Sequence, residues 1–204
     1  MKRYNYRPTL SIILGMVLFV GLFIGCASRS SNAVKKDVEI KSAKVIAVLP
    51  VDNRTPDFKA PQLLRLKVFD ELYFKGYSKL PLEVIDQKLE LLYFGEKKNG
   101  TGVVSPSVVK ELVGADAAMY CTLSEGERKS GLFYAPVTVA ASCELRSTQT
   151  GEVLWNSRYK TTSRNFDLPG KNLEMKSYEA FETVIEDVVN KVLETLPDGP
   201  NLKG

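Results

Sequence analysis

Histidine is missing from all 204 residues of this chain, and cysteine and tryptophan are rare, with three and one. Without an imidazole the chain has no Ser-His-Asp or Cys-His arrangement, no two-histidine zinc motif and no imidazole base. A phosphate-binding glycine loop is missing too, because "GTG" at 100–102 has no following lysine and no preceding strand. We therefore expect no cofactor, no metal site and no enzyme activity.

A large excess of charge is also missing. The formal net charge is +4, and Lys2, Arg3 and Arg7 supply three of these charges before Asp37, the first acidic residue. The chain beyond residue 25 is therefore close to neutral and lacks the basic surface that nucleic-acid binding requires. We expect no nucleic-acid partner.

One long apolar run is present, and it lies near the N-terminus. Leu10 to Ile24 would form a helix of about 22 Å, which is short of the ~30 Å hydrocarbon core of a bilayer. Together with the basic residues before it, this run predicts a signal peptide over residues 1–25. "FIGC" at 23–26 is similar to the bacterial lipobox, although Phe23 stands where that motif usually has Leu.

The lipobox predicts that the chain is cleaved before Cys26 and that this cysteine is lipidated. An uncleaved membrane anchor and a cleaved chain with a free Cys26 are the alternatives. Two acyl chains already give stable anchoring. Ala27 and Ser28 follow without an aspartate, as in lipoproteins that are sorted to the outer membrane. We predict a lipid anchor in the outer membrane, with the protein facing the periplasm.

The chain after the anchor divides into a tether, a domain and a tail. Residues 26–39 are polar and aperiodic, which predicts a flexible tether with a mean reach of roughly 20 Å. Residues 40–198 carry the hydrophobic patterns of an α/β domain, and 199–204 form a short tail.

The first half of the predicted domain alternates strands and helices. Unbroken apolar character at 44–51 predicts a strand covered on both faces, and a second strand is expected at 78–85. The expected helices are bounded by proline, glycine or a capping residue (Asp86 for the second) and cover 61–75, 86–94 and 106–113.

The second half of the domain predicts an antiparallel meander and a final helix. Alternating segments with short connections are expected as strands at 116–125, 135–147 and 152–162, with Trp155 in the core. A long apolar stripe from Tyr178 to Leu196 follows Ser177 as its cap. The initial β-α-β unit requires a parallel pair. We therefore predict a single α/β domain with a mixed sheet and helices packed on it.

Asp52, Asn53 and Asp57 form the first candidate site. They follow the first predicted strand at its carboxyl end, where open α/β sheets place ligands. Two carboxylates in one loop are able to bind a small ligand or to transfer protons. The simpler interpretation, which the sequence favours, is that these side chains satisfy loop amides and cap the next helix.

Cys121 and Cys143 lie on the apolar faces of neighbouring predicted strands, in an oxidising compartment. A disulfide requires Cα atoms within about 7 Å. A hairpin centred on Ser130 places Cys121 opposite Val139 and favours two buried free thiols. A shift of the centre by two residues would align the cysteines for a disulfide, so both alternatives stay open.

Leu132, Phe133 and Tyr134 are three consecutive bulky residues at the tip of that hairpin. Such a cluster either folds under the sheet, which the sequence favours, or forms a surface for a partner.

Three segments, "VIAVLPVDNRTPD", "GADAAMYCTL" and "TGEVLWNSRYK", taken in this order resemble a family of bacterial outer-membrane lipoproteins of unknown function, of the surface-antigen type. The wider fold group of that family includes the N-terminal domain of TolB, LpoB and CsgG. The resemblance covers roughly residues 43–196. It implies a periplasm-facing lipoprotein domain and gives no catalytic residue to carry over.

The sequence thus favours a non-enzymatic, lipid-anchored envelope protein. We expect it to bind an envelope protein or a companion lipoprotein, with a homo-oligomer as one form of assembly. A small-ligand or cell-wall-binding domain that uses the loop at 52–57 is the first alternative. A structural subunit of a secretion complex is the second.

Overall fold

Six strands form one mixed sheet in the computed structural model, which describes residues 40, 42–95, 104–128, 134–166 and 171–202. The strand order is β3-β1-β4-β5-β6, with β2 beside β4. β1 runs parallel to β3 and β4, whereas β4, β5 and β6 form an antiparallel meander. The strands are β1 (Val45–Val48), β2 (Asp52–Asn53), β3 (Ser78–Lys79), β4 (Ala117–Arg128), β5 (Tyr134–Ser147) and β6 (Val153–Phe166).

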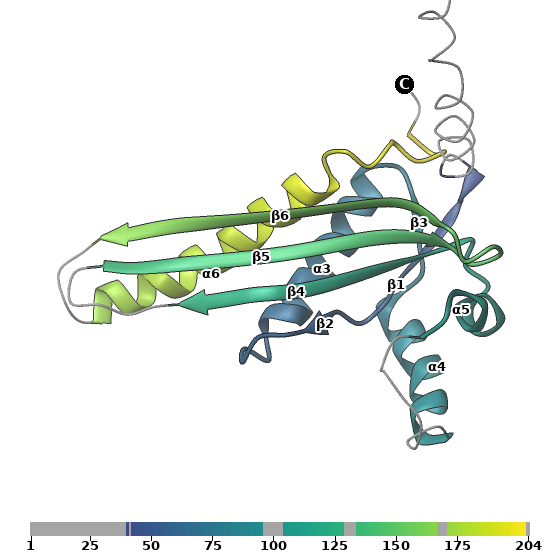
Figure 1. The fold of residues 1–204 in the computed structure, drawn as a ribbon, viewed down its shortest axis with the longest axis horizontal. Coiled ribbons are helices and arrows are strands. Elements are labelled where there is room, and N and C mark those ends of the chain that lie inside the picture. The colour runs from purple at the N-terminus through teal and green to yellow at the C-terminus, as the bar shows by residue number, and fades with distance from the viewer. Residues whose placement is uncertain (1–39, 41, 96–103, 129–133, 167–170, 203–204) are drawn as a thin grey trace, which may run out of the picture. The chain divides into compact units, whose positions relative to one another are not determined.

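Four helices in the described part of the chain cover this sheet unequally. Figure 1 shows α3 and α6 behind the meander, while α4 and α5 lie at the end of the sheet that holds β1. The other face of the meander carries no helix among the described residues. The helices are α3 (Ala60–Phe74), α4 (Leu82–Gly95), α5 (Pro106–Val113) and α6 (Lys171–Leu193). This arrangement confirms the predicted single α/β domain with an open mixed sheet.

β1 is buried on both faces, as its unbroken apolar run predicts. Ile46 and Val48 belong to the larger core, which lies between the sheet and helices α3 and α6. Ala47 and Leu49 point the other way, into a smaller core formed with α4 and α5. Because successive strand residues alternate between faces, only a strand between two layers needs apolar residues at every position.

The larger core joins α6 to the meander. Alternate residues of β5 face the helix, and they meet residues of α6 at helical spacing: Val137, Val139, Ala141, Cys143, Leu145, Phe181, Val184, Ile185, Val188, Val189 and Val192. Each large aliphatic side chain buried in this way contributes about 1.5–3 kcal/mol. Trp155 lies in the same core, as predicted, and its indole N–H donates to Thr195 Oγ1 over 3.1 Å.

Two element boundaries differ from the sequence prediction. The strand expected at 78–85 is only Ser78–Lys79, and α4 already begins at Leu82. The carbonyl of Pro81 accepts hydrogen bonds from Val84 and Ile85, so the proline starts the helix instead of interrupting a strand. Asp86 therefore lies inside α4 and does not cap it.

The last helix also begins earlier than expected. α6 starts at Lys171, so Ser177 is an internal residue of the helix. The apolar stripe marks only the part of the helix that packs on the core, whereas the preceding residues include good helix formers and are not apolar at the required spacing.

Residues 199–202, expected as a short tail, hydrogen-bond back to the end of α3. The Gly199 amide donates to the Lys75 carbonyl over 2.7 Å, and the Asn201 amide donates to the Gly76 carbonyl over 3.0 Å. Within the described ranges, no helix combines the length and the apolar character that crossing a bilayer would require.

Candidate functional site

The loop at 52–57 begins with a short strand that continues along β4. Asp52 and Asn53 form β2 and pair in parallel with Thr122 and Leu123. The Arg54 amide extends this pairing by donating to the Leu123 carbonyl over 2.9 Å. The backbone of the candidate loop is therefore held against the sheet before it turns toward α3.

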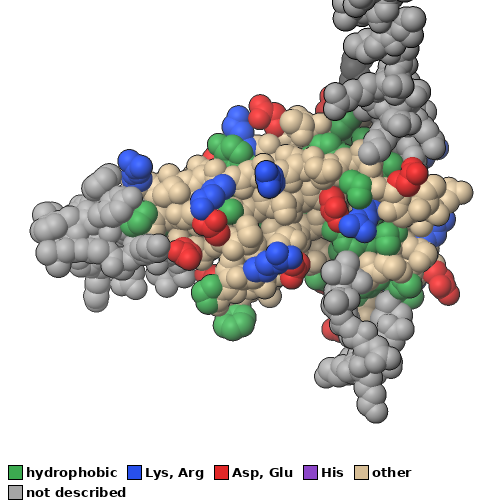
Figure 2. All heavy atoms as spheres, in the orientation of Figure 1, with side chains coloured by type: hydrophobic (Ala, Val, Ile, Leu, Met, Phe, Trp, Pro, Cys, Tyr) green, Lys and Arg blue, Asp and Glu red, His purple; other side chains and the backbone are tan. Residues whose placement is uncertain are grey.

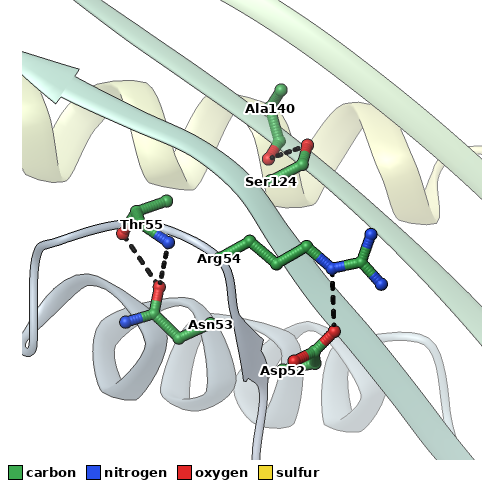
Figure 3. A network of polar contacts seen from close by, with 6 residues as sticks. All are labelled: Asp52, Asn53, Arg54, Thr55, Ser124 and Ala140. Carbon is green, nitrogen blue, oxygen red and sulfur yellow. Dashed lines mark hydrogen bonds and ion pairs between the residues drawn. The ribbon is translucent and has the colours of Figure 1, made fainter.

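Asn53 organises the turn. Its Oδ1 accepts hydrogen bonds from the Thr55 amide (3.0 Å) and the Thr55 hydroxyl (2.8 Å). Its Nδ2 donates to the Asp57 carbonyl over 2.9 Å. Figure 3 shows Asn53 and Thr55 facing each other across the turn. Both ends of the Asn53 amide are thus engaged inside the loop.

The two carboxylates of the loop serve different partners. Asp57 Oδ1 accepts hydrogen bonds from the amides of Lys59 (2.8 Å) and Ala60 (2.9 Å), which caps α3. Asp52 accepts from Arg54 Nε over 3.1 Å in an exposed pair on the opposite side of the turn (Figure 3). This geometry matches the structural interpretation of the loop, in which side chains stabilise the turn and begin the helix.

Arg65 is the important polar residue that sequence reasoning missed. It lies on α3 and is only 9% exposed. Its Nε and Nη2 donate to the Val48 carbonyl over 3.1 and 2.9 Å, and its Nη1 donates to an Asp86 carboxylate oxygen over 2.8 Å. One guanidinium therefore links the end of β1 to both α3 and α4.

The position of Arg65 bears directly on ligand binding. β1 lies between β3 and β4 in the sheet. After β1, the chain forms β3 on one side of it and later β4 on the other side, so the order of the strands reverses at β1. In open α/β sheets, ligands bind in the crevice at the carboxyl end of such a strand. Here the guanidinium of Arg65 takes the Val48 carbonyl at that end.

The sequence held only a weak signal for this residue. Arg65 follows Leu64 on a helix whose buried side also carries Val68 and Leu72. A cation next to an apolar stripe usually extends its head group into water. Its anionic partner, Asp86, is remote in sequence and lies where the pattern predicts a helix cap, so nothing in the local pattern indicates a buried ion pair.

The structure joins Cys121 and Cys143 in a disulfide that is buried in the larger core. The two residues lie directly opposite each other in the ladder of β4 and β5, with Cα atoms 4.1 Å apart. The predicted pairing of Cys121 with Val139 is wrong, because Val139 pairs with Gly126. The hairpin is centred two residues later in the chain than assumed.

An irregularity in β4 also changes the register by one residue along this pair of strands. Leu123 pairs with Ala141 and Glu125 pairs with Ala140, which leaves Ser124 as an extra residue. The Ser124 hydroxyl donates to the Ala140 carbonyl over 3.1 Å, as Figure 3 shows.

Three predicted site residues lie outside the described residues: Cys26, Leu132 and Phe133. Tyr134 is the first residue of β5 and pairs with Phe166, but its side chain is also outside the description. Lipidation at Cys26 and partner contact at the hairpin tip therefore stay predictions.

The uncovered face of the meander is polar and carries both signs of charge. Figure 2 shows this face with Lys and Arg side chains interspersed with Asp and Glu among uncharged surface. Lys160 Nζ contacts both carboxylate oxygens of Glu125 at 2.7 Å, and the hydroxyls of Thr138 and Thr162 lie 3.0 Å apart. Cross-strand pairs of this kind stabilise a sheet face that meets water.

Two tyrosine hydroxyls are held as neutral donors. Burial raises the pKa of Tyr77 to about 12, and the charge of Asp198 adds to this effect. Burial also raises the pKa of Tyr120 to about 12. Tyr77 donates to the Pro197 carbonyl (2.7 Å) and holds the segment after α6, whereas Tyr120 of β4 donates to the Val104 carbonyl (2.8 Å) and holds the segment before α5. Within the described ranges, no cluster of three acidic or cysteine side chains is arranged to hold a metal ion.

These features define a small α/β domain in which the polar groups of the loop at 52–57 and those around Arg65 are engaged in internal hydrogen bonds. The chain belongs to the GNA1162-like family, whose model, described as "Putative lipoprotein GNA1162-like", matches residues 37–201. The family resemblance carried by the three sequence segments is thereby confirmed.

Several solved structures are similar to this chain. Lipoprotein GNA1162 from Neisseria meningitidis is 20% identical, with 69% of this chain and 96% of that chain covered and a TM-score of 0.52. The PelC dodecamer from Paraburkholderia phytofirmans is 16% identical, with 76% and 89% covered and a TM-score of 0.48. The LpoB C-terminal domain from Escherichia coli is 15% identical, with 72% and 96% covered and a TM-score of 0.43. No curated protein matches the sequence.

Proposed function

We propose that this chain is a non-enzymatic, lipid-anchored envelope protein whose α/β domain binds a protein partner. In this proposal Cys26 carries the lipid, the anchor lies in the outer membrane and the domain faces the periplasm. The partner is another envelope protein or a companion lipoprotein, which includes a second copy of this chain.

Support for the anchor comes from two independent sources. The family matched over residues 37–201 is described as a lipoprotein family. This match does not include the predicted signal peptide or Cys26. The lipobox-like "FIGC" lies upstream of the matched range, at the end of the apolar run. The lipobox-like segment and the family match, which come from different parts of the chain, therefore both support a lipoprotein.

The observation that carries the binding role is that the polar groups at the end of β1 are engaged inside the domain. Arg65 takes the carbonyl of Val48, and Asp86 neutralises the guanidinium. The neighbouring loop uses Asn53 and Asp57 on its own backbone. Because the two places where this fold would hold a small ligand are engaged internally, they give no support to the small-ligand alternative.

The uncovered face of the meander is the surface that we assign to the partner. It is broad, polar and charged in both signs, and such surfaces suit protein recognition through electrostatic complementarity more than burial of a small molecule. Ser142 lies exposed on this face in the middle of β5, where it pairs with Thr122 and Arg158.

Site-specific photocrosslinking in intact cell envelopes tests this assignment. A photoreactive amino acid would replace Ser142 in the full chain, and the control would carry it at Asn190, which is exposed on α6. We expect a discrete protein adduct, identified by mass spectrometry, from position 142 only. Monomer alone from position 142, or the same products from both positions, would contradict the partner role of this face.

A further inference from the structure

An exposed aromatic patch lies at the C-terminal end of α3. Tyr73 is 63% exposed and Phe74 70% exposed, and their rings stand edge to face with centroids 6.0 Å apart. Leu202, which is 45% exposed, adds an aliphatic side chain. We call Tyr73, Phe74 and Leu202 the aromatic patch. It borders an open groove of about 510 Å³ whose floor includes Ser78.

The C-terminal segment is fixed against this patch. Gly76 adopts φ +82°, and a Cβ at this position would lie 2.4 Å from the Leu202 amide nitrogen. The close approach of the two backbones therefore depends on glycine. Asn201 adds a side-chain hydrogen bond to the Ser78 hydroxyl over 3.0 Å. The patch is a built feature of the domain and not a loose end of the chain.

The patch lies beside the point where the predicted tether enters the domain. The Ser78 amide donates to the Lys44 carbonyl over 3.0 Å, and Ser78 pairs with Val45 at the start of β1. One turn earlier, Ile40 is buried in the larger core, with its carbonyl bound by the Ala43 amide. The chain at Lys44 and Val45, where β1 begins, therefore lies beside the groove that the aromatic patch borders.

From this placement we propose that the aromatic patch contacts the lipid bilayer that holds the Cys26 anchor. The inference rests on the proposed anchor. A tether with a mean reach of roughly 20 Å keeps this end of the domain close to the membrane surface. Exposed tyrosine and other aromatic rings are favoured in the interfacial region of a bilayer, where they have apolar contacts while polar tips meet water.

A cation accompanies the rings, as an interfacial contact favours. Lys79 Nζ lies 3.7 Å from the centroid of the Phe69 ring and 5.0 Å from that of the Tyr73 ring. It also pairs with Asp70 at 3.2 Å, so the net charge of this corner is small. We therefore expect the contact to depend on ring insertion more than on anionic lipid.

Phe58 provides a matched control. It is 85% exposed and precedes α3, whereas Phe74 ends it. The 15 residues of α3 that lie between the two positions form a helix of about 22 Å. Because both residues are exposed phenylalanines at opposite ends of one helix, a difference between them reflects their position and not their hydrophobicity.

The test uses the full-length protein purified from membranes and reconstituted into vesicles of phosphatidylethanolamine and phosphatidylglycerol, with or without dibrominated phosphatidylcholine. Phe74→Trp and Phe58→Trp variants are compared with the native chain, whose single Trp155 is buried and gives the background. We expect blue-shifted emission and bromine quenching of the added signal for Phe74→Trp only.

The outcomes separate this inference from the anchor. If the protein fails to float with vesicles, the anchor is wrong and the inference falls with it. If the protein floats but Phe74→Trp is not quenched, or is quenched no more than Phe58→Trp, the anchor stands and the membrane contact is wrong. A protein adduct from a photoreactive group at position 74, in place of quenching, would assign the patch to a protein partner.

Discussion

Arg65 shows at the scale of single residues how a buried cation is satisfied at the end of β1. A buried guanidinium needs acceptors for its donors, and here the end of β1 and the side chain of Asp86 supply them. The same contacts that satisfy the arginine occupy the place where a ligand would lie. These contacts therefore stabilise the domain and engage the last carbonyl group of β1.

Replacing Arg65 with methionine is expected to lower the free energy of unfolding by about 2 kcal/mol, because the Val48 carbonyl stays buried without its donors. Lys67 on the same helix is the control. It pairs with Glu182 and Glu186 across to α6, and both carboxylates are largely exposed, so Lys67→Met should cost at most about 1 kcal/mol. Urea unfolding of both variants measures the difference. Equal costs would mean that the buried contacts of Arg65 add nothing.

The loop at 52–57 offers a second paired test at this scale. Asp57→Ala removes the cap of α3 and should cost about 1 kcal/mol, whereas Asp52→Ala breaks an exposed ion pair and should change stability by less than about 0.5 kcal/mol. Thermal unfolding of the two variants checks the order. Loss of glycan or small-ligand binding in both, with the fold retained, would favour the ligand-binding alternative.

The two neutral tyrosines predict how stability depends on alkaline pH. Their folded-state pKa values, about 12, lie above the ordinary value of 10, so the unfolded chain releases these protons first. Their contribution is complete below pH 10 and is lost as the pH rises from about 10 to 12. Chemical unfolding at several pH values should show this decline, and it should be shallower in Tyr77→Phe. An unchanged slope in that variant would remove Tyr77 from the explanation.

At the scale of the elements, the sequence predicted best where the pattern and the packing have the same cause. β1 is buried on both faces and reads as an unbroken apolar run, and β5 alternates because only one of its faces meets α6. α5 runs from Pro106 to a left-handed Gly114, which are local signals. Such elements are predictable because the residue type at each position follows from whether that position is buried, exposed or at the end of a helix.

Register and long-range pairing were not predictable in this way. An extra residue at Ser124 and a later hairpin centre set which residue faces Cys121, and neither follows from alternation. The partnership of Arg65 with Asp86 depends on two helices being packed beside the same strand end. The role of the candidate loop was easier to predict, because Asn53 and Asp57 form hydrogen bonds with residues only a few positions away in sequence.

The disulfide between β4 and β5 is expected to stabilise the pairing of these two strands. It closes a segment of 22 residues between two strands, and removing it is expected to cost about 3 kcal/mol because the unfolded chain gains freedom. The double variant Cys121→Ala and Cys143→Ala, compared with the native protein by urea unfolding, measures this loss. Adding a reductant should destabilise the native protein and leave the variant unchanged. An equal effect of the reductant on both would contradict this account.

At the scale of the whole molecule, the proposed partner-binding domain and the proposed membrane anchor lie in different parts of the chain. The lipoprotein family covers the domain, whereas the proposed anchor lies at Cys26, outside the described residues. The aromatic patch beside the tether gives the domain a proposed orientation, which leaves the open face of the meander free for a partner. The proposed membrane contact of the aromatic patch depends on the proposed anchor at Cys26, and so does the proposed orientation of the domain.

The most direct test of this arrangement is the mass of the mature N-terminus in protein extracted from bacterial membranes. We predict that residues 1–25 are absent and that the first residue, Cys26, carries the added mass of acyl chains. A chain that retains Met1, or one that begins at Cys26 with no added mass, would contradict the lipid anchor and the orientation built on it.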